Sequence, residues 1–172
     1  MELKKAKRIA EKLVKKLQPY CDRIEIAGSI RRKKPEVKDI EIVCIPSDFN
    51  GSRHSKYIQI VERLEKVKGD ATKGKYTQRI TPEGIKLDLF TARKENWGFI
   101  LSQRTGSADY SHNVLAKGWV KKGYRSIDTI LVKDGVQYPM LEEIDVFNII
   151  GIPWAEPEDR NYVKEQITND IP

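Results

Sequence analysis

The segment 28–41 constrains this chain more than any other, because a Gly-Ser turn and a run of cations there separate two short apolar stretches. The second stretch opens with Asp39-Ile40-Glu41, so a β-strand would put both carboxylates on one face. Neighbouring carboxylates repel each other unless a cation lies between them, and hard oxygen ligands suit Mg²⁺, with Mn²⁺ as an alternative. The segment therefore predicts a metal site at the edge of a sheet.

A third carboxylate, Asp88, lies in a second strand-like run in which Leu87 and Leu89 flank it. Pairing of the two predicted strands would bring Asp88 beside Asp39 and Glu41. Three carboxylates at one edge can hold two metal ions about 3.5 to 4 Å apart, which stabilises the attacking and leaving oxygens of phosphoryl transfer. We therefore predict that Asp39, Glu41 and Asp88 are catalytic metal ligands.

The residues before the acidic pair suit a phosphate group. Gly28 has no side chain to block approach to the backbone, and amides at such a turn can bind anions. Arg32 supplies a planar fork that matches phosphate oxygens. An ordinary turn leading into a solvated basic loop is the alternative. The order of turn, cations, acidic pair and third acid favours the phosphate and metal site.

Size and composition indicate a globular protein. The 172 residues can bury one sizeable core or two small ones, and 39% hydrophobic with 33% charged residues excludes a disordered chain. No apolar run approaches the roughly 20 residues of a membrane span, and the lysine-rich start lacks a signal peptide. We expect a cytoplasmic monomer that does not bind membranes, with Cys21 and Cys44 as reduced thiols.

The positive charge is concentrated at the start of the chain. Residues 1–38 hold thirteen Lys and Arg against five Asp and Glu, a balance of +8 in a protein whose net charge is +7. This distribution suits a polyanionic substrate, with cations on its phosphates and acids on the metals. A solvated helix face that keeps the protein soluble is the alternative for any single lysine.

Hydrophobic periodicity and turn residues predict the remaining elements. The expected helices span 3–18, 56–67, 95–103, 114–122 and 142–150, and the expected strands span 24–27, 40–45, 76–81, 84–90, 126–132 and 136–138. We interpret Glu142 and Glu143 as favourable charges at the start of the last helix rather than as catalytic groups.

The segment 28–41 resembles the nucleotidyltransferase signature, and more narrowly that of the family X (DNA polymerase beta-like) polymerases. The resemblance covers about residues 10–160 and continues through Leu87-Asp88-Leu89, Thr105-Gly106-Ser107, Asn113, Lys122-Gly123-Tyr124 and the tail 152–160. It implies an α+β fold. A nucleotidyltransferase palm, a mixed sheet with helices on one face, would span 1–92, and a small C-terminal α/β nucleotide-selecting subdomain would span 93–172.

The resemblance also implies roles for individual residues. Those expected at the nucleotide are Gly28, Ser29, Arg32, Lys38, Gln103, Arg104, Thr105, Gly106, Ser107 and Asn113. Lys86 and Lys117 are expected at the DNA, although a salt bridge between Lys86 and Asp88 is an equal alternative.

The chain departs from the family pattern at several positions. Gln103 and Arg104 stand where aromatic residues are common beside the nucleotide sugar, Glu41 stands where Asp is usual, and Lys38 replaces a small residue. The chain also resembles a truncated two-subdomain form known from a large DNA virus, without a lyase module or a helix-hairpin-helix clamp. We therefore expect no deoxyribose-phosphate lyase activity.

We expect a Mg²⁺-dependent nucleotidyltransferase that adds nucleoside monophosphates from a (d)NTP to a DNA 3′-OH and releases pyrophosphate. Gapped or primer-template DNA would be its partner, as in a small repair-type polymerase. Two alternatives remain: the same chemistry on RNA, a protein or a small molecule, and a catalytically silent DNA-binding module.

Overall fold

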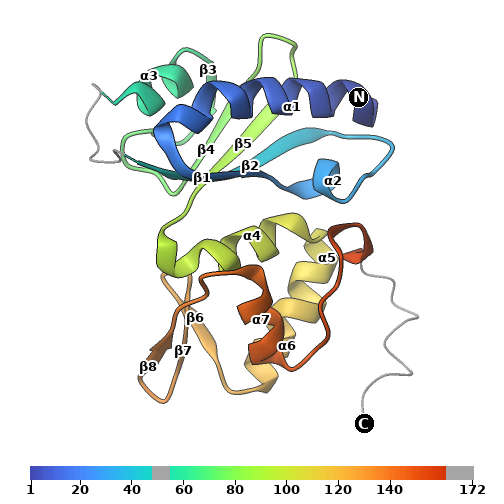
Figure 1. The fold of residues 1–172 in the computed structure, drawn as a ribbon, viewed down its shortest axis with the longest axis vertical. Coiled ribbons are helices and arrows are strands. Elements are labelled where there is room, and N and C mark those ends of the chain that lie inside the picture. The colour runs from blue at the N-terminus through green and yellow to red at the C-terminus, as the bar shows by residue number, and fades with distance from the viewer. Residues whose placement is uncertain (48–54, 162–172) are drawn as a thin grey trace.

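The computed structural model describes residues 1–47 and 55–161, which form two stacked layers (Figure 1). The sheet layer comprises the described residues up to 92, and the C-terminal layer comprises residues 93–161. The strands of the sheet layer are β1 (Cys21–Ile26), β2 (Asp39–Pro46), β3 (Glu65–Lys68), β4 (Tyr76–Ile80) and β5 (Lys86–Thr91). Its helices are α1 (Leu3–Leu17), α2 (Gly28–Arg31) and α3 (Lys56–Glu62), with a 3-10 turn at Gln18–Tyr20.

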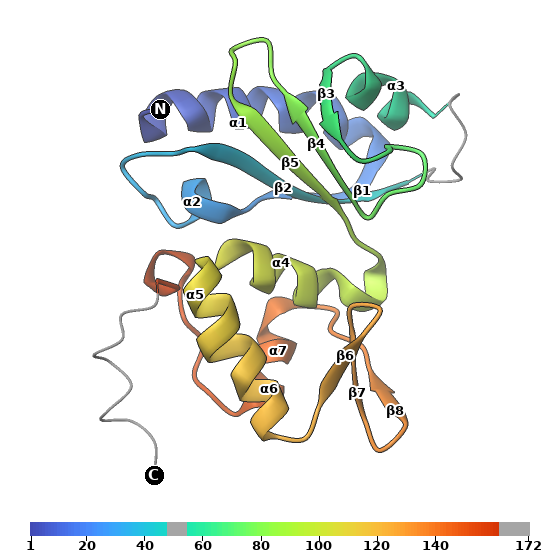
Figure 2. The ribbon, with the colours of Figure 1, turned by 180° about the vertical axis from the view of Figure 1, so that it is seen from behind.

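The C-terminal layer combines helices with a small antiparallel sheet. Its helices are α4 (Trp97–Thr105), α5 (Ala108–Tyr110), a π-helix (Ser111–Ala116), α6 (Lys117–Lys121) and α7 (Glu143–Ile150), with 3-10 turns at Lys94–Asn96 and Pro157–Asp159. Its strands are β6 (Arg125–Ile127), β7 (Ile130–Lys133) and β8 (Val136–Tyr138). The helix α4 runs along the underside of the large sheet in both views (Figure 1, Figure 2).

The large sheet is mixed, as predicted. Its strand order is β1-β2-β5-β4-β3, and β2 and β5 are parallel whereas the other neighbours are antiparallel. The register places Glu41 opposite Asp88 and Asp39 opposite Lys86. The predicted pairing of the two acidic strands is therefore confirmed, and it fixes where the carboxylates lie.

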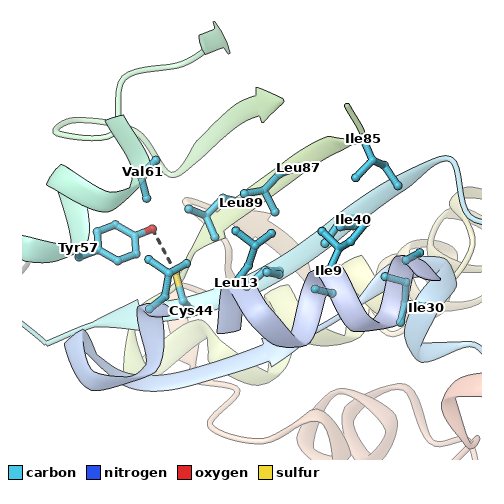
Figure 3. Close-up of a cluster of buried hydrophobic side chains, with 14 of the residues drawn as sticks. Ile9, Leu13, Ile30, Ile40, Cys44, Tyr57, Val61, Ile85, Leu87 and Leu89 are labelled. Carbon is cyan, nitrogen blue, oxygen red and sulfur yellow. Dashed lines mark hydrogen bonds between the residues drawn. The ribbon is translucent and has the colours of Figure 1, made fainter. Parts of the chain in front are cut away.

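The outer face of the sheet carries the first hydrophobic core (Figure 3). The apolar stripe of α1, including Ile9 and Leu13, packs against Ile40 of β2 and Leu87 of β5. Within this core the Cys44 thiol lies 3.3 Å from the Tyr57 hydroxyl, and both cysteines are free, as expected. The stripe fills the space above the sheet, so the lysines of α1 face solvent on the side away from the C-terminal layer.

The inner face of the sheet shares the second core with the C-terminal layer. Val43 of β2 and Phe90 of β5 belong to the same buried cluster as Trp97, Leu115 and Phe147. Because Asp39, Glu41 and Asp88 alternate with the outward isoleucines and leucines, their side chains share this inner face with Val43 and Phe90. The sheet thus directs its carboxylates toward the C-terminal layer.

Several predicted boundaries are wrong for local reasons. The helix predicted over 56–67 ends at Glu62, and β3 follows it. The strand predicted over 126–132 is two strands, because Asp128 and Thr129 adopt left-handed conformations with φ of 50° and 63° and turn the chain. The segment predicted as a helix from 114 is already helical at Ser111. In the described part of the chain, no helix combines the length and apolar character that a membrane span requires.

Candidate active site

Two adjacent strands, β2 and β5, place the acidic side chains in one region of the inner face. Asp88 of β5 lies between Glu41 of β2 and Gln78 of β4, and Asp39 stands two residues before Glu41 on the same strand. The sheet register alone therefore collects three carboxylates that lie up to 49 positions apart along the chain.

The surroundings of Glu41 disfavour its charged form. Burial, followed by repulsion from Asp39 and Asp88, raises the pKa of Glu41 from 4.5 to about 7, against the opposing effects of Arg104 and Arg32. A carboxyl that resists ionisation next to two other acids is the condition that a bound cation would relieve. The arrangement thus suits a positively charged ligand.

The acids fit Mg²⁺ only if other groups complete its coordination. Within residues 1–47 and 55–161, no group of three or more His, Cys, Asp or Glu side chains lies so that it could hold a metal ion. Mg²⁺ normally keeps several waters and uses one or two carboxylates together with substrate phosphates. The carboxylates present are therefore the donors that such an ion would use, with a phosphate-bearing substrate supplying the rest.

Gly28 makes room for the Glu41 carboxylate. Its backbone has φ of +60°, and an added Cβ would lie 1.8 Å from Oε2 of Glu41. No side chain fits at this distance, and the left-handed conformation further favours glycine. The sequence suggested Gly28 as an approach route for phosphate, whereas the contact seen is with the carboxylate that is one methylene longer than the usual Asp.

An open pocket of about 280 Å³ joins the predicted phosphate residues to two of the acids. Its lining consists of Ser29, Arg32, Lys34, Glu36, Lys38, Asp39 and Glu41. The hydroxyl of Ser29 is buried and, among the described residues, has no hydrogen-bond partner. An unpaired buried hydroxyl beside three cations suits an anionic ligand, since such a ligand would satisfy it.

Arg32 contributes to this pocket from a fixed position. It donates through Nη1 to the Thr105 carbonyl at 2.8 Å and through Nε to Oδ1 of Asn161 at 3.1 Å. Burial lowers the pKa of Arg32, while Glu41 and then Asp39 oppose that shift. The guanidinium therefore ties the sheet layer to the C-terminal layer as well as facing the pocket, a role that the sequence did not indicate.

The Thr105-Gly106-Ser107 element makes structural contacts in this structure. The Thr105 hydroxyl accepts from Arg31 at 2.6 Å, and the Ser107 hydroxyl accepts from the Tyr110 amide at 3.1 Å. An added Cβ on Gly106 would lie 2.8 Å from the Tyr110 ring. These contacts explain the residue types at this turn through the packing of α4 with α2 and α5, and the predicted role at the nucleotide sugar stays a prediction.

Of the two residues that precede Thr105, Arg104 acts on the acidic region. Its guanidinium lies over the Phe90 ring at 4.2 Å from the centroid, and its charge acts on Glu41. The backbone carbonyl of Gln103 accepts from the Ser111 hydroxyl at 2.7 Å. An exposed arginine therefore adds positive charge near the acids, at a position where the sequence resemblance predicts an aromatic ring.

Two solved structures of polymerase beta from Leishmania infantum resemble this chain. The ternary P/T complex has a TM-score of 0.72 at 18% identity and aligns 94% of this chain with 77% of that one. The ternary gap complex has a TM-score of 0.71 at 17% identity, with 93% and 70% covered. The fold is similar to that of polymerase beta. No protein-family model matches the sequence, and no curated protein sequence matches it either.

The predicted DNA contacts lie apart from each other in this polymerase beta-like fold. Lys86 is exposed opposite Asp39, and within the described residues it forms no ion pair, so the alternative salt bridge to Asp88 is absent. Asn113, expected at the nucleotide, accepts a hydrogen bond from Lys117, expected at the DNA, at 2.7 Å. No hydrogen bond or ion pair of the described chain joins either residue to the acids.

Sequence reasoning missed two classes of feature. Tyr76 and Gln78 of β4 donate to Asp88 at 2.5 and 2.7 Å, although β4 was predicted only as a strand. Of the basic first quarter, the loop cations Arg32, Lys34 and Lys38 line the pocket beside the acids, whereas α1 covers the opposite face of the sheet. The prediction that these cations bind a polyanionic substrate stays a prediction. Counting residues outward from the predicted turn at 82–84 pairs Gln78 with Asp88 and would have indicated the contacts of β4 with this acid.

Proposed function

We propose that this protein is a Mg²⁺-dependent nucleotidyltransferase that extends a DNA 3′-OH with nucleoside monophosphates from a (d)NTP. The observation that carries the proposal is the register of β2, β5 and β4. It gathers Asp39, Glu41 and Asp88 beside a pocket that suits phosphate. The similarity to polymerase beta supports the same class of reaction, and gapped or primer-template DNA is the proposed substrate.

Each group of residues then has a distinct task. Ser29, Arg32 and Lys38 would bind the β and γ phosphates and hold the triphosphate in line with the acceptor. Asp39, Glu41 and Asp88 would hold Mg²⁺, which when bound neutralises charge on the transferring phosphate. We assign the palm to residues 1–92 and the nucleotide-selecting unit to residues 93–172.

Replacement of Asp88 tests the assignment. We expect Asp88→Ala to abolish primer extension on a one-nucleotide gap, because it removes a carboxylate from the transferring site, while DNA binding is largely retained. The matched control is Glu11→Ala, which removes an exposed acid on α1 whose only ion pair among the described residues is with Lys7 at 3.8 Å. Extension by Asp88→Ala at the wild-type rate would refute the metal assignment.

The acceptor and the sugar need a separate measurement. Each dNTP and NTP is tested singly against every template base on gapped DNA, with single-stranded DNA and RNA as competing acceptors. Gln103 and Arg104 have hydrogen-bonding groups at the position where an aromatic ring would exclude a ribose. The measurement therefore includes the transfer of ribonucleotides. Strong transfer only to an acceptor that is not nucleic acid would exclude the polymerase proposal.

A further inference from the structure

Of the three acids, Asp88 is the one that accepts hydrogen bonds from neighbouring side chains. The Tyr76 hydroxyl donates to Oδ1 of Asp88 at 2.5 Å, and Nε2 of Gln78 donates to the same oxygen at 2.7 Å. The amide of Gln78 also lies 3.2 Å from the Tyr76 hydroxyl. The second oxygen, Oδ2, has no hydrogen-bond partner among the described residues.

Both donors belong to β4, which carries none of the three acids, and contacts with β5 fix their positions. Gln78 stands directly opposite Asp88 in the antiparallel pair of β4 and β5, so its amide reaches the carboxylate without a turn of the backbone. The Tyr76 ring stacks on Phe90, with centroids 5.0 Å apart and an interplanar angle of 26°. Strand pairing therefore fixes the position of Gln78, and ring stacking fixes the position of Tyr76.

The chemistry of the tyrosine keeps it a donor. Burial, followed by the hydrogen bond and the charge of Asp88, raises the pKa of Tyr76 above its usual range. A phenol has one proton to donate, and the contact with Oδ1 of Asp88 uses it. A glutamine amide likewise donates at every pH of interest.

We propose that Tyr76 and Gln78 are positioning residues that occupy Oδ1 of Asp88 and leave Oδ2 as its single reactive oxygen. This inference rests on the proposed function. A carboxylate with one oxygen engaged in this way ligates through the other, and the strict octahedral geometry of Mg²⁺ makes that orientation matter. Hydrogen bonds to ligating carboxylates typically contribute about 10–100-fold to metal affinity or activity.

The test removes each hydrogen-bond donor while keeping a side chain of similar size. Tyr76→Phe keeps the ring that stacks on Phe90, and Gln78→Met keeps a chain of similar length. We expect each change to lower kcat for gap extension about tenfold and to weaken Mn²⁺ binding, measured by titration without substrate, by a similar factor. The KM for the nucleotide stays unchanged because the phosphate pocket is untouched.

The controls carry the same substitutions elsewhere. Tyr138→Phe and Gln137→Met lie on β8, outside the proposed site, and should leave kcat and Mn²⁺ affinity at the wild-type values. A merely structural role for Tyr76 and Gln78 would lower the unfolding midpoint without changing Mn²⁺ affinity. That result would overturn the inference.

Asp88→Asn distinguishes an error in the positioning role from an error in the proposed function. If the wild-type protein extends primers and binds Mn²⁺, Asp88→Asn loses both, and Tyr76→Phe with Gln78→Met matches the wild type, the positioning role alone is wrong. If the wild-type protein neither binds Mn²⁺ nor transfers a nucleotide, the proposed function fails and the positioning role fails with it.

Discussion

Glu41 lowers the stability of the folded protein when it is ionised, at a position that suits a bound cation. Its carboxylate is held against Gly28, two other acids act on it, and burial costs it hydration. These conditions favour the protonated form in the folded protein, so the ionised site stores unfavourable energy until a cation arrives. Gly28 is the residue that permits this position, since any Cβ there would displace the carboxylate.

The raised pKa of Glu41 predicts a specific dependence of stability on pH. Its folded-state pKa of about 7 exceeds the ordinary value of 4.5, so the folded state binds the proton more tightly than the unfolded state. The stabilisation is fully present below pH 4.5 and is lost as the pH rises through 7. We expect the wild type to lose up to about 3 kcal/mol of unfolding free energy between pH 4.5 and 8 relative to Glu41→Gln.

Chemical denaturation at both pH values without divalent ions measures this difference. Excess Mg²⁺ at pH 8 should restore the wild type and stabilise Glu41→Gln less, since the variant retains only Asp39 and Asp88 of the three carboxylates. Identical pH profiles for the two proteins would contradict the perturbed carboxyl.

At the scale of elements, α1 contributes to the fold through its packing on the outer face of the sheet, and its lysines lie on the opposite side of the sheet from the acids. Its stripe includes Ile9, which is 4% exposed and lies in the core shown in Figure 3. We expect Ile9→Ala to cost about 2–5 kcal/mol of unfolding free energy, because it leaves a cavity above the sheet. Lys16→Ala on the solvent face should change it by less than about 0.5 kcal/mol. Urea titration compares them, and equal losses would contradict this packing.

The same elements show what the sequence could and could not predict. Periodicity found α1 and the strands that carry Asp39 and Asp88, because burial on one face leaves a pattern along the chain. It missed the turn at Asp128-Thr129, where non-glycine residues adopt positive φ, and the early end of α3. The donors to Asp88 depend on register between strands. Register emerges only when the turn and both strands are aligned together.

At the scale of the whole molecule, ion pairs complement the shared core between the layers. Glu143 of α7 accepts from Arg31 at 2.9 and 2.7 Å and from Arg160 at 2.5 Å. Arg160 is fully buried and Glu143 is 6% exposed, whereas the neighbouring pair of Arg23 and Glu142 is exposed. The interpretation of Glu143 as a charge that merely favours the helix start is therefore incomplete, because this carboxylate holds two arginines from distant parts of the chain.

This contrast predicts different costs for two adjacent glutamates. Glu143→Ala leaves two guanidiniums without their shared acceptor, and we expect it to cost about 3–5 kcal/mol of unfolding free energy, with little sensitivity to salt. Glu142→Ala breaks an exposed pair and should cost less than about 1 kcal/mol, an effect that high salt removes. Because Arg31 is the last residue of α2 and directly precedes Arg32, Glu143→Ala should also raise the nucleotide KM, which Glu142→Ala should not. Denaturation at low and high salt, with steady-state kinetics on the same samples, measures both effects. Equal losses for the two variants would mean that the buried network does not hold the layers together.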